Sequence, residues 1–236
     1  MLQEDIFRSG ELLLPTTPPE AAAPVETVPL SGTILVVAAV LLFLVTIRSF
    51  LNVLPYLRDS ISRARGSAPL ENSVKVSRDR NLVAAVFLLP AILLVFRYRL
   101  YDPAFLQDLE PDYRLLAVAG AIVGFLLLRF VLYRWMMPRR RYDDYQMAYR
   151  VGYTYFILLM MLALVTVGIL YIIGADDLMV KRFLLVETGL TYLLYLLRRT
   201  QILSTSCKPL TTFLYLCGLE LLPAALLVGS AVIPVG

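Results

Sequence analysis

Six long apolar runs dominate this chain, and each is close to the length that an α-helix needs to cross a bilayer. About 20 residues at a rise of 1.5 Å span the hydrocarbon core. Helices satisfy all their backbone hydrogen bonds internally, as lipid requires. We therefore predict an all-α polytopic membrane protein, a bundle of about six transmembrane helices with interfacial helices. The runs cover approximately residues 31–51, 81–96, 115–133, 151–173, 179–197 and 210–233.

Two of the six runs are weaker than the others. The run 81–96 is short and contains Pro90, and the run 179–197 contains Glu187, which is typical of a helix buried among others. Six spans are predicted, with five as the alternative. The composition fits either number, because 59% of the residues are hydrophobic and 17% are charged. Soluble domains carry about 25% charged residues and could not cover so much apolar surface.

Residues 1–30 differ in composition from the membrane domain formed by residues 31–236. They are acidic and proline-rich, which predicts a flexible tail on the outside. The lysine and arginine residues predict the orientation, because cytoplasmic loops are enriched in them. With the amino terminus outside, most of the 22 basic residues, including Arg198 and Arg199, lie at the inner face. Both termini are therefore predicted on the outer side of the membrane.

Two connecting segments have the pattern of interfacial helices. Apolar residues recur at helical spacing from Phe50 to Ile61, which predicts a helix that continues from the first span along the bilayer surface. Further along, Asp102 and Pro103 are suited to begin a short helix, as N-cap and first helical residue.

Gly120 and Gly124 form a small-xxx-small pattern in the third span. Such a face lets two helices approach closely. The pattern is common in membrane helices, so it predicts tight packing within the bundle and indicates no chemistry.

A tyrosine stripe beside an arginine cluster leads into the fourth span. Amphipathic rings prefer the headgroup level and arginines anchor inner loops, so an aromatic belt with positive-inside anchoring is the favoured interpretation. The alternative is contact with lipid headgroups, because clustered arginines bind phosphate. The residues concerned are Arg139, Arg140, Arg141, Tyr142, Tyr145 and Tyr149.

Two carboxylates lie deep inside the last two spans. Counted at 1.5 Å per residue, Glu187 is about 12 Å from the outer end of its span and Glu220 about 15 Å from the inner end. Consecutive spans are antiparallel, so both are predicted near the bilayer middle. An ionised carboxylate there costs several kcal/mol unless it is paired, hydrated or protonated. The predicted polar cluster consists of Glu187, Glu220, Thr191, Tyr195, Tyr215 and Arg129.

This cluster allows a structural and a functional interpretation, which the sequence leaves open. It could be a polar clamp, with protonated glutamates or with Glu220 bridged to Arg129. It could instead form a proton-coupled transport site or supply the acid and base of an intramembrane transferase. Pro223 removes a backbone hydrogen bond and disturbs the carbonyl of Leu219, so a helix kink beside Glu220 is predicted.

Catalytic and ligand-binding motifs are otherwise missing from the sequence. The chain contains no histidine, and its two cysteines, Cys207 and Cys217, have no metal-ligand spacing. No phosphate-binding loop occurs. We therefore predict no metal and no cofactor, and we predict no nucleic-acid partner because the net charge of +4 mostly reflects loop topology. Whether the chain is an enzyme stays open, with a non-enzymatic role favoured.

The closing pattern "KPLTTFLYLCGLELLPAALL", preceded by "ETGLTYLLYLLRR", resembles an uncharacterised integral-membrane family of Bacteroidota, a domain of unknown function. A final helix of that family likewise carries a tyrosine, a cysteine or threonine, then Leu-Glu and a proline. The resemblance covers roughly residues 50–228. It implies the inner membrane of a Gram-negative cell and no established activity.

Two functions follow as predictions. The favoured one is a non-catalytic subunit or assembly factor of a cell-envelope complex, with the bilayer and a membrane protein as partners. The alternative is a transporter or intramembrane transferase for a lipid-linked or small polar substrate, which would use Glu187 and Glu220. The sequence does not predict an oligomeric state.

Overall fold

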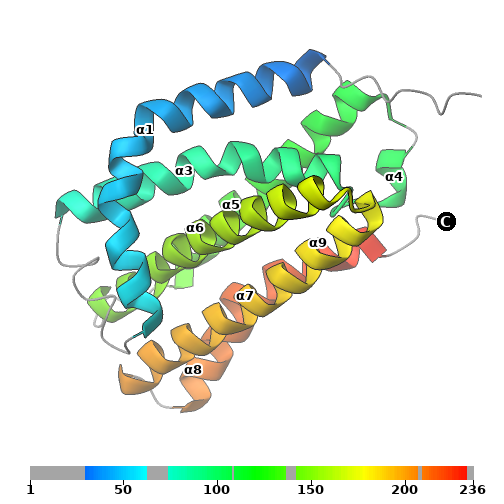
Figure 1. Cartoon of the computed structure of the whole chain (residues 1–236). Coiled ribbons are helices and arrows are strands. Elements are labelled where there is room, and N and C mark those ends of the chain that lie inside the picture. The colour runs from blue at the N-terminus through cyan, green and yellow to red at the C-terminus, as the bar shows by residue number, and fades with distance from the viewer. Residues whose placement is uncertain (1–29, 63–73, 108, 137–141, 207–208, 233–236) are drawn as a thin grey trace, which may run out of the picture.

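The computed structural model of the chain describes residues 30–62, 74–107, 109–136, 142–206 and 209–232 (Figure 1). All regular secondary structure in these ranges is helical, so the predicted all-α class is confirmed. The elements are α1 (Leu30–Ser62), α3 (Val74–Arg97), α4 (Ala104–Gln107), α5 (Pro111–Met136), α6 (Tyr142–Ile173), α7 (Asp177–Ser206), α8 (Pro209–Leu216), η3 (Cys217–Leu221) and α9 (Leu222–Val232). The last three follow one another without a break.

Five helical stretches are long and apolar enough to cross a membrane, which makes the chain a polytopic membrane protein. The sixth predicted span lies in α7, which has 30 residues but is not among the five. The reason is charge, because α7 carries Glu187 in its apolar part and Arg198 and Arg199 further on. The five stretches are Gly32–Leu57, Lys75–Arg97, Pro111–Trp135, Gln146–Ile173 and Leu210–Ala231.

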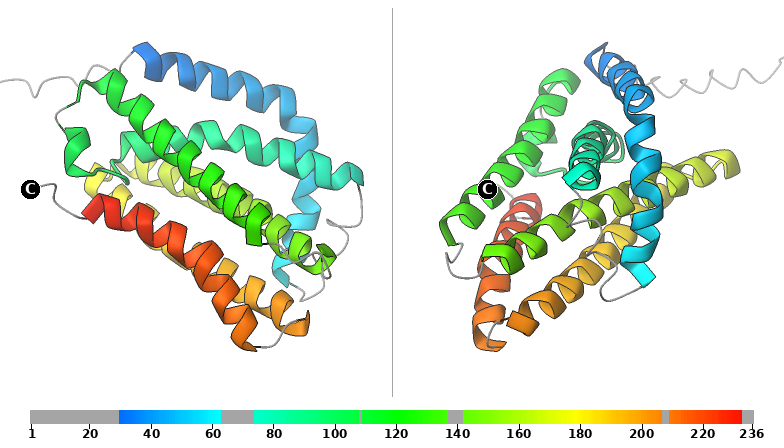
Figure 2. Two further views of the ribbon diagram at one scale, coloured as in Figure 1. Left: turned by 180° about the vertical axis from the view of Figure 1, so that it is seen from behind. Right: turned by 90° about the vertical axis from the view of Figure 1, so that its left-hand side faces the viewer.

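Helix α3 lies inside the arrangement and contacts α1, α5 and α6 (Figure 2). Val83 and Phe87 of α3 are buried together with Ile157 and Met160 of α6. Further contacts join α6 to α7, α7 to α8, and α5 to both η3 and α9. These contacts bring α5, α7 and η3 together.

The predicted interfacial segments are helical. In Figure 1, α1 changes direction part-way along, and its second part crosses α3. Val53 and Leu57 in this second part are buried against residues of α3 and α6. The predicted short helix is present as α4, but it begins at Ala104, one residue after the predicted start at Pro103; the carboxylate of Asp102, the predicted N-cap, accepts a hydrogen bond from Arg114 at 2.7 Å.

The small-residue face of α5 is not packed within the described part of the bundle. A Cβ added at Gly120 or Gly124 would have no heavy atom within 4 Å, and both residues are exposed. The prediction of tight packing at this face is therefore wrong for the described residues. The neighbouring Leu116, Val123 and Leu127 are exposed as well.

Candidate functional site

Glu220 lies in the π-helical segment η3, which ends at Leu221, two residues before Pro223. The proline has no N–H and its ring would collide with the carbonyl of Leu219, four residues earlier. The backbone takes a wider turn there, in which the Leu222 N–H donates to the carbonyl of Cys217. The structure thus shows a change in hydrogen-bond pattern at this point, and the kink itself stays a prediction. Such π segments are frequent at functional sites.

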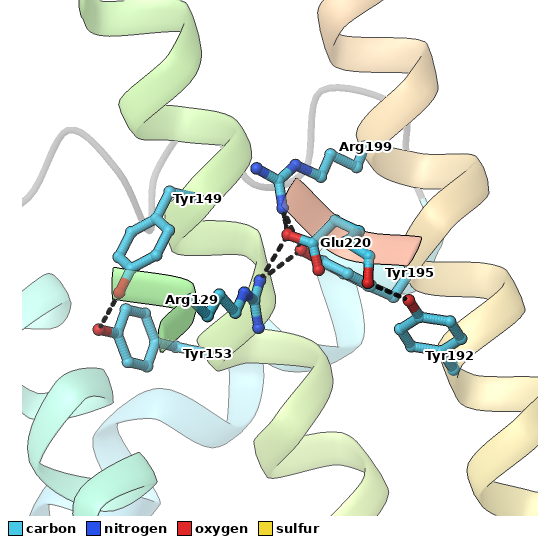
Figure 3. Close-up of polar contacts among 7 residues, drawn as sticks. All are labelled: Arg129, Tyr149, Tyr153, Tyr192, Tyr195, Arg199 and Glu220. Carbon is cyan, nitrogen blue, oxygen red and sulfur yellow. Dashed lines mark hydrogen bonds and ion pairs between the residues drawn. The ribbon is translucent and has the colours of Figure 1, made fainter. Parts of the chain in front are cut away.

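Two arginines from different helices pair with the Glu220 carboxylate (Figure 3). Arg129 of α5 donates from Nη2 to Glu220 Oε1 at 3.0 Å. Arg199 of α7 pairs through Nη1 with the same oxygen. The predicted bridge between Arg129 and Glu220 is therefore present, with a second cation that joins it.

Two tyrosines of α7 form further hydrogen bonds to Glu220 and to its two arginine partners. The Tyr195 hydroxyl accepts hydrogen bonds from Arg129 Nη2 and from Arg199 Nη1, each at 2.5 Å. The Tyr192 hydroxyl donates to the backbone carbonyl of Glu220 at 3.1 Å. Helix α7 thereby holds both the side chain and the backbone of Glu220.

Aromatic rings surround the two guanidinium groups. The Arg129 guanidinium carbon lies 5.8 Å from the ring centre of Tyr149 and 5.5 Å from that of Tyr195. The Arg199 carbon lies 5.9 Å from the ring centre of Tyr195 and 5.8 Å from that of Tyr215. Contacts of this kind are worth about 0.5–1 kcal/mol at exposed sites and about 2 kcal/mol when desolvated.

Gly152 of α6 leaves the space that the Arg129 side chain fills. A Cβ at this position would lie 3.1 Å from Arg129 Nη2 and 3.7 Å from the Tyr195 ring. Such a distance is tighter than an ordinary van der Waals contact, so a Cβ here would require the guanidinium group to shift by a few tenths of an ångström. The site is thus formed by α5, α6, α7 and η3 together.

Burial makes this pairing necessary. The side chain of Glu220 is 4% exposed, that of Arg199 is fully buried and that of Arg129 is 20% exposed. An unpaired charge in such surroundings costs several kcal/mol. The two cations account for the charge of Glu220.

Glu187 has a different environment from Glu220. Its Oε1 accepts a hydrogen bond from Thr166 of α6 at 3.0 Å. Its Oε2 is buried and has no partner among the described residues. Tyr195 follows eight residues later on α7, which places the paired cluster about 12 Å further along the helix axis. Thr191, between them, is buried.

The predicted headgroup contacts are described only at Tyr149. Arg139, Arg140 and Arg141 lie outside the described residues, as do the side chains of Tyr142 and Tyr145. The ring of Tyr149 stacks on Tyr133 with centres 4.3 Å apart, and its hydroxyl accepts a hydrogen bond from Tyr153 at 3.4 Å. Tyr149 therefore extends the aromatic surroundings of Arg129.

Arg199 is the main residue that the predicted cluster missed. It was assigned to the inner face because it follows the predicted fifth span, but α7 continues to Ser206 and buries it completely. The four-residue step from Glu187 through Thr191 and Tyr195 leads directly to Arg199, and this spacing was the signal that could have placed it on the same helix face.

Comparisons with models of protein families, with curated proteins and with solved structures find no match for this chain. Within the described ranges, no group of three or more histidine, cysteine, aspartate or glutamate residues could hold a metal ion. What the geometry offers is a buried set of cationic donors, one carboxylate and phenolic hydroxyls. Such a set can join helices or bind a charged group.

Proposed function

We propose that this chain is a non-catalytic subunit or assembly factor of a cell-envelope complex in an inner membrane. The observation that carries the proposal is the double ion pair of Glu220. A guanidinium group cannot give up its proton in a protein. The one carboxylate of the cluster is already engaged by two such groups. The cluster is therefore suited to fix α5, α7 and η3 to one another rather than to move protons.

The outer surface of α5 supports a membrane partner. Gly120 and Gly124 lie four residues apart with open space beside them, in a helix whose neighbouring leucines are exposed. Small residues at this spacing allow a second helix to approach closely, and van der Waals packing then drives association in lipid. The partner would be a transmembrane helix of another chain.

The placement in an inner membrane rests on the basic residues and on the sequence resemblance. Basic residues gather on the side where α5 and α7 end, which fits a cytoplasmic face and periplasmic termini. Membership of the Bacteroidota family is part of the same proposal.

Purification of the tagged chain from its native membrane in mild detergent tests the proposal. We expect a membrane protein to be recovered in a fixed ratio with the wild type. The double variant Gly120→Leu/Gly124→Leu should reduce its recovery by about tenfold, because the close approach is blocked. Gly168→Leu on α6 is the matched control, since that glycine also has open space beside it. No recovery with any of the proteins would contradict the proposed subunit role, whereas equal recovery with all of them would contradict the proposed contact at Gly120 and Gly124.

A proton-coupled transporter is the second candidate, and Glu187 is the observation that favours it. Its Oε2 is buried without a partner among the described residues, so this carboxylate is not engaged as that of Glu220 is. In proteoliposomes with a pH-sensitive dye, a membrane potential would then drive proton movement that Glu187→Gln abolishes. The subunit proposal predicts no such movement with either protein.

A further inference from the structure

The cluster around Glu220 contains more positive than negative charge. Arg129 and Arg199 are both cations at any physiological pH. Among the described residues, Glu220 is the carboxylate that pairs with them. The cluster therefore has one formal positive charge in excess, and its Arg129 and Glu220 lie in two of the membrane-crossing stretches.

Several of the charged donors are also without an acceptor. Nε and Nη2 of Arg199 and Nε of Arg129 are buried and have no hydrogen-bond partner among the described residues. Figure 3 shows one nitrogen of the Arg199 guanidinium directed at Glu220 and another directed away from it. Buried donors in proteins nearly always have an acceptor, and charged donors most of all. One negatively charged acceptor would supply both the missing bonds and the missing charge.

We propose that Arg129 and Arg199 bind one phosphate group in addition to Glu220. A phosphate offers several acceptor oxygens to two guanidinium groups that come from different helices, which is the geometry that arginine favours. This inference goes beyond the proposed subunit role, because it holds with or without a protein partner.

The position of the cluster favours the phosphate of an anionic lipid. Arg129 and Arg199 each lie seven residues before the last residue of their helices, α5 and α7, hence about 10 Å from the same side of the bundle. Long basic side chains reach the headgroup level from such depths. Arg129 is 20% exposed, so its edge can be reached from outside, and the buried Arg199 pairs with the same Glu220 oxygen. Inorganic phosphate has the same chemistry and is the second source.

The charge excess can be changed stepwise, and this gives the experiment. Arg129→Gln removes the excess and leaves Arg199 paired with Glu220, whereas Glu220→Gln raises the excess from one charge to two. Arg134→Gln is the matched control, because it removes one cation from an exposed position on the same helix. The full chain and each variant are placed in nanodiscs of phosphatidylcholine, with or without phosphatidylglycerol, and their thermal unfolding is measured. A third set contains phosphatidylcholine and added inorganic phosphate.

We expect phosphatidylglycerol to raise the Tm of the wild type and of Arg134→Gln by about 5 °C, the effect of one or two charged hydrogen bonds in a chain of this size. The rise should be absent in Arg129→Gln and larger in Glu220→Gln. If inorganic phosphate alone produces the same rise, the ligand is a free phosphate; if only phosphatidylglycerol does, it is a lipid headgroup.

Two results would overturn the inference. One is a wild-type Tm that neither phosphatidylglycerol nor inorganic phosphate changes. In that case the group that compensates the excess positive charge would be an acidic side chain of a protein partner. The other is a rise that Arg129→Gln retains in full, since the site would then lie elsewhere. If Glu220→Gln does not fold, the comparison of Arg129→Gln with Arg134→Gln decides alone.

Discussion

Replacement of Gly152 by alanine tests the packing of the site with the smallest change available. The new Cβ would lie 3.1 Å from Arg129 Nη2, the atom that donates to both Tyr195 and Glu220. A side chain there requires the guanidinium group to shift by a few tenths of an ångström relative to its two acceptors. Because the group is held by both acceptors at once, we expect this shift to cost up to one charged hydrogen bond, about 1.5–3 kcal/mol. Alanine also favours the helix over glycine by about 1 kcal/mol, so the net loss is about 0.5–2 kcal/mol.

Gly168→Ala is the matched control on the same helix. Its Cβ would meet nothing within 4 Å, so it gains the helix propensity without a steric cost. The two variants should therefore differ by about 2 kcal/mol in the free energy of unfolding, or roughly 4–8 °C in Tm. Circular dichroism during heating in detergent measures this difference.

A double-mutant cycle with Arg129→Gln tests whether the stability cost of Gly152→Ala comes from the contact with Arg129. In that background the long side chain is gone, and Gly152→Ala should behave like Gly168→Ala. If Gly152→Ala already equals its control in the wild type, or if its cost persists without Arg129, the described packing of α6 against the cluster is wrong.

Three further predictions concern the neighbouring contacts and the orientation. Tyr195→Phe removes the hydroxyl acceptor that both arginines share, so it should lower the free energy of unfolding by about 1–3 kcal/mol, measured by thermal unfolding. The control Tyr171→Phe, at a residue that is 83% exposed, should change it little. Thr166→Val leaves Glu187 Oε1 without its hydrogen-bond donor and should lower the free energy of unfolding by about 1–3 kcal/mol by the same measurement. Thr188→Val, at an exposed position, is the control. Equal effects of the two variants would contradict the hydrogen bond between Thr166 and Glu187. Alkaline phosphatase fused to the carboxyl terminus should be active in the periplasm, and an inactive fusion with an active cytoplasmic reporter would reverse the predicted orientation.

The helices could be predicted because hydropathy alone determines which segments enter lipid. All five membrane-crossing stretches contain a predicted run completely or nearly so, and α1 continues past its run as the apolar spacing after Phe50 indicated. Helix α7 was harder to predict as a membrane span, because its length is sufficient to cross a bilayer but its charged residues are not typical of a span. One of those charges, Arg199, belongs to the cluster, so the site itself weakens the signal for the helix that carries it.

Within the site, the sequence placed Glu220, Arg129 and Tyr195 together from depth alone. Depth along a helix follows from counting residues, whereas the direction of a side chain depends on packing. Counting residues therefore predicts Arg199 at the inner face of the membrane, and the role of Gly152 could not be predicted, since it depends on which helix lies opposite. The packing predicted for Gly120 was wrong for the same reason: a small face does not indicate which neighbour, if any, it meets.

The π-helical segment imposes a length constraint on the last membrane-crossing stretch. In an α-helix, residues five apart point about 140° away from each other, yet Tyr215 and Glu220 both reach Arg199. The i→i+5 pattern between them brings the two side chains to one face. Deletion of a single residue between positions 216 and 219 would let the segment return to α-helical spacing, and the halves before and after it would turn relative to each other. The chain thus tolerates exchange of apolar side chains here far more readily than a change in their number.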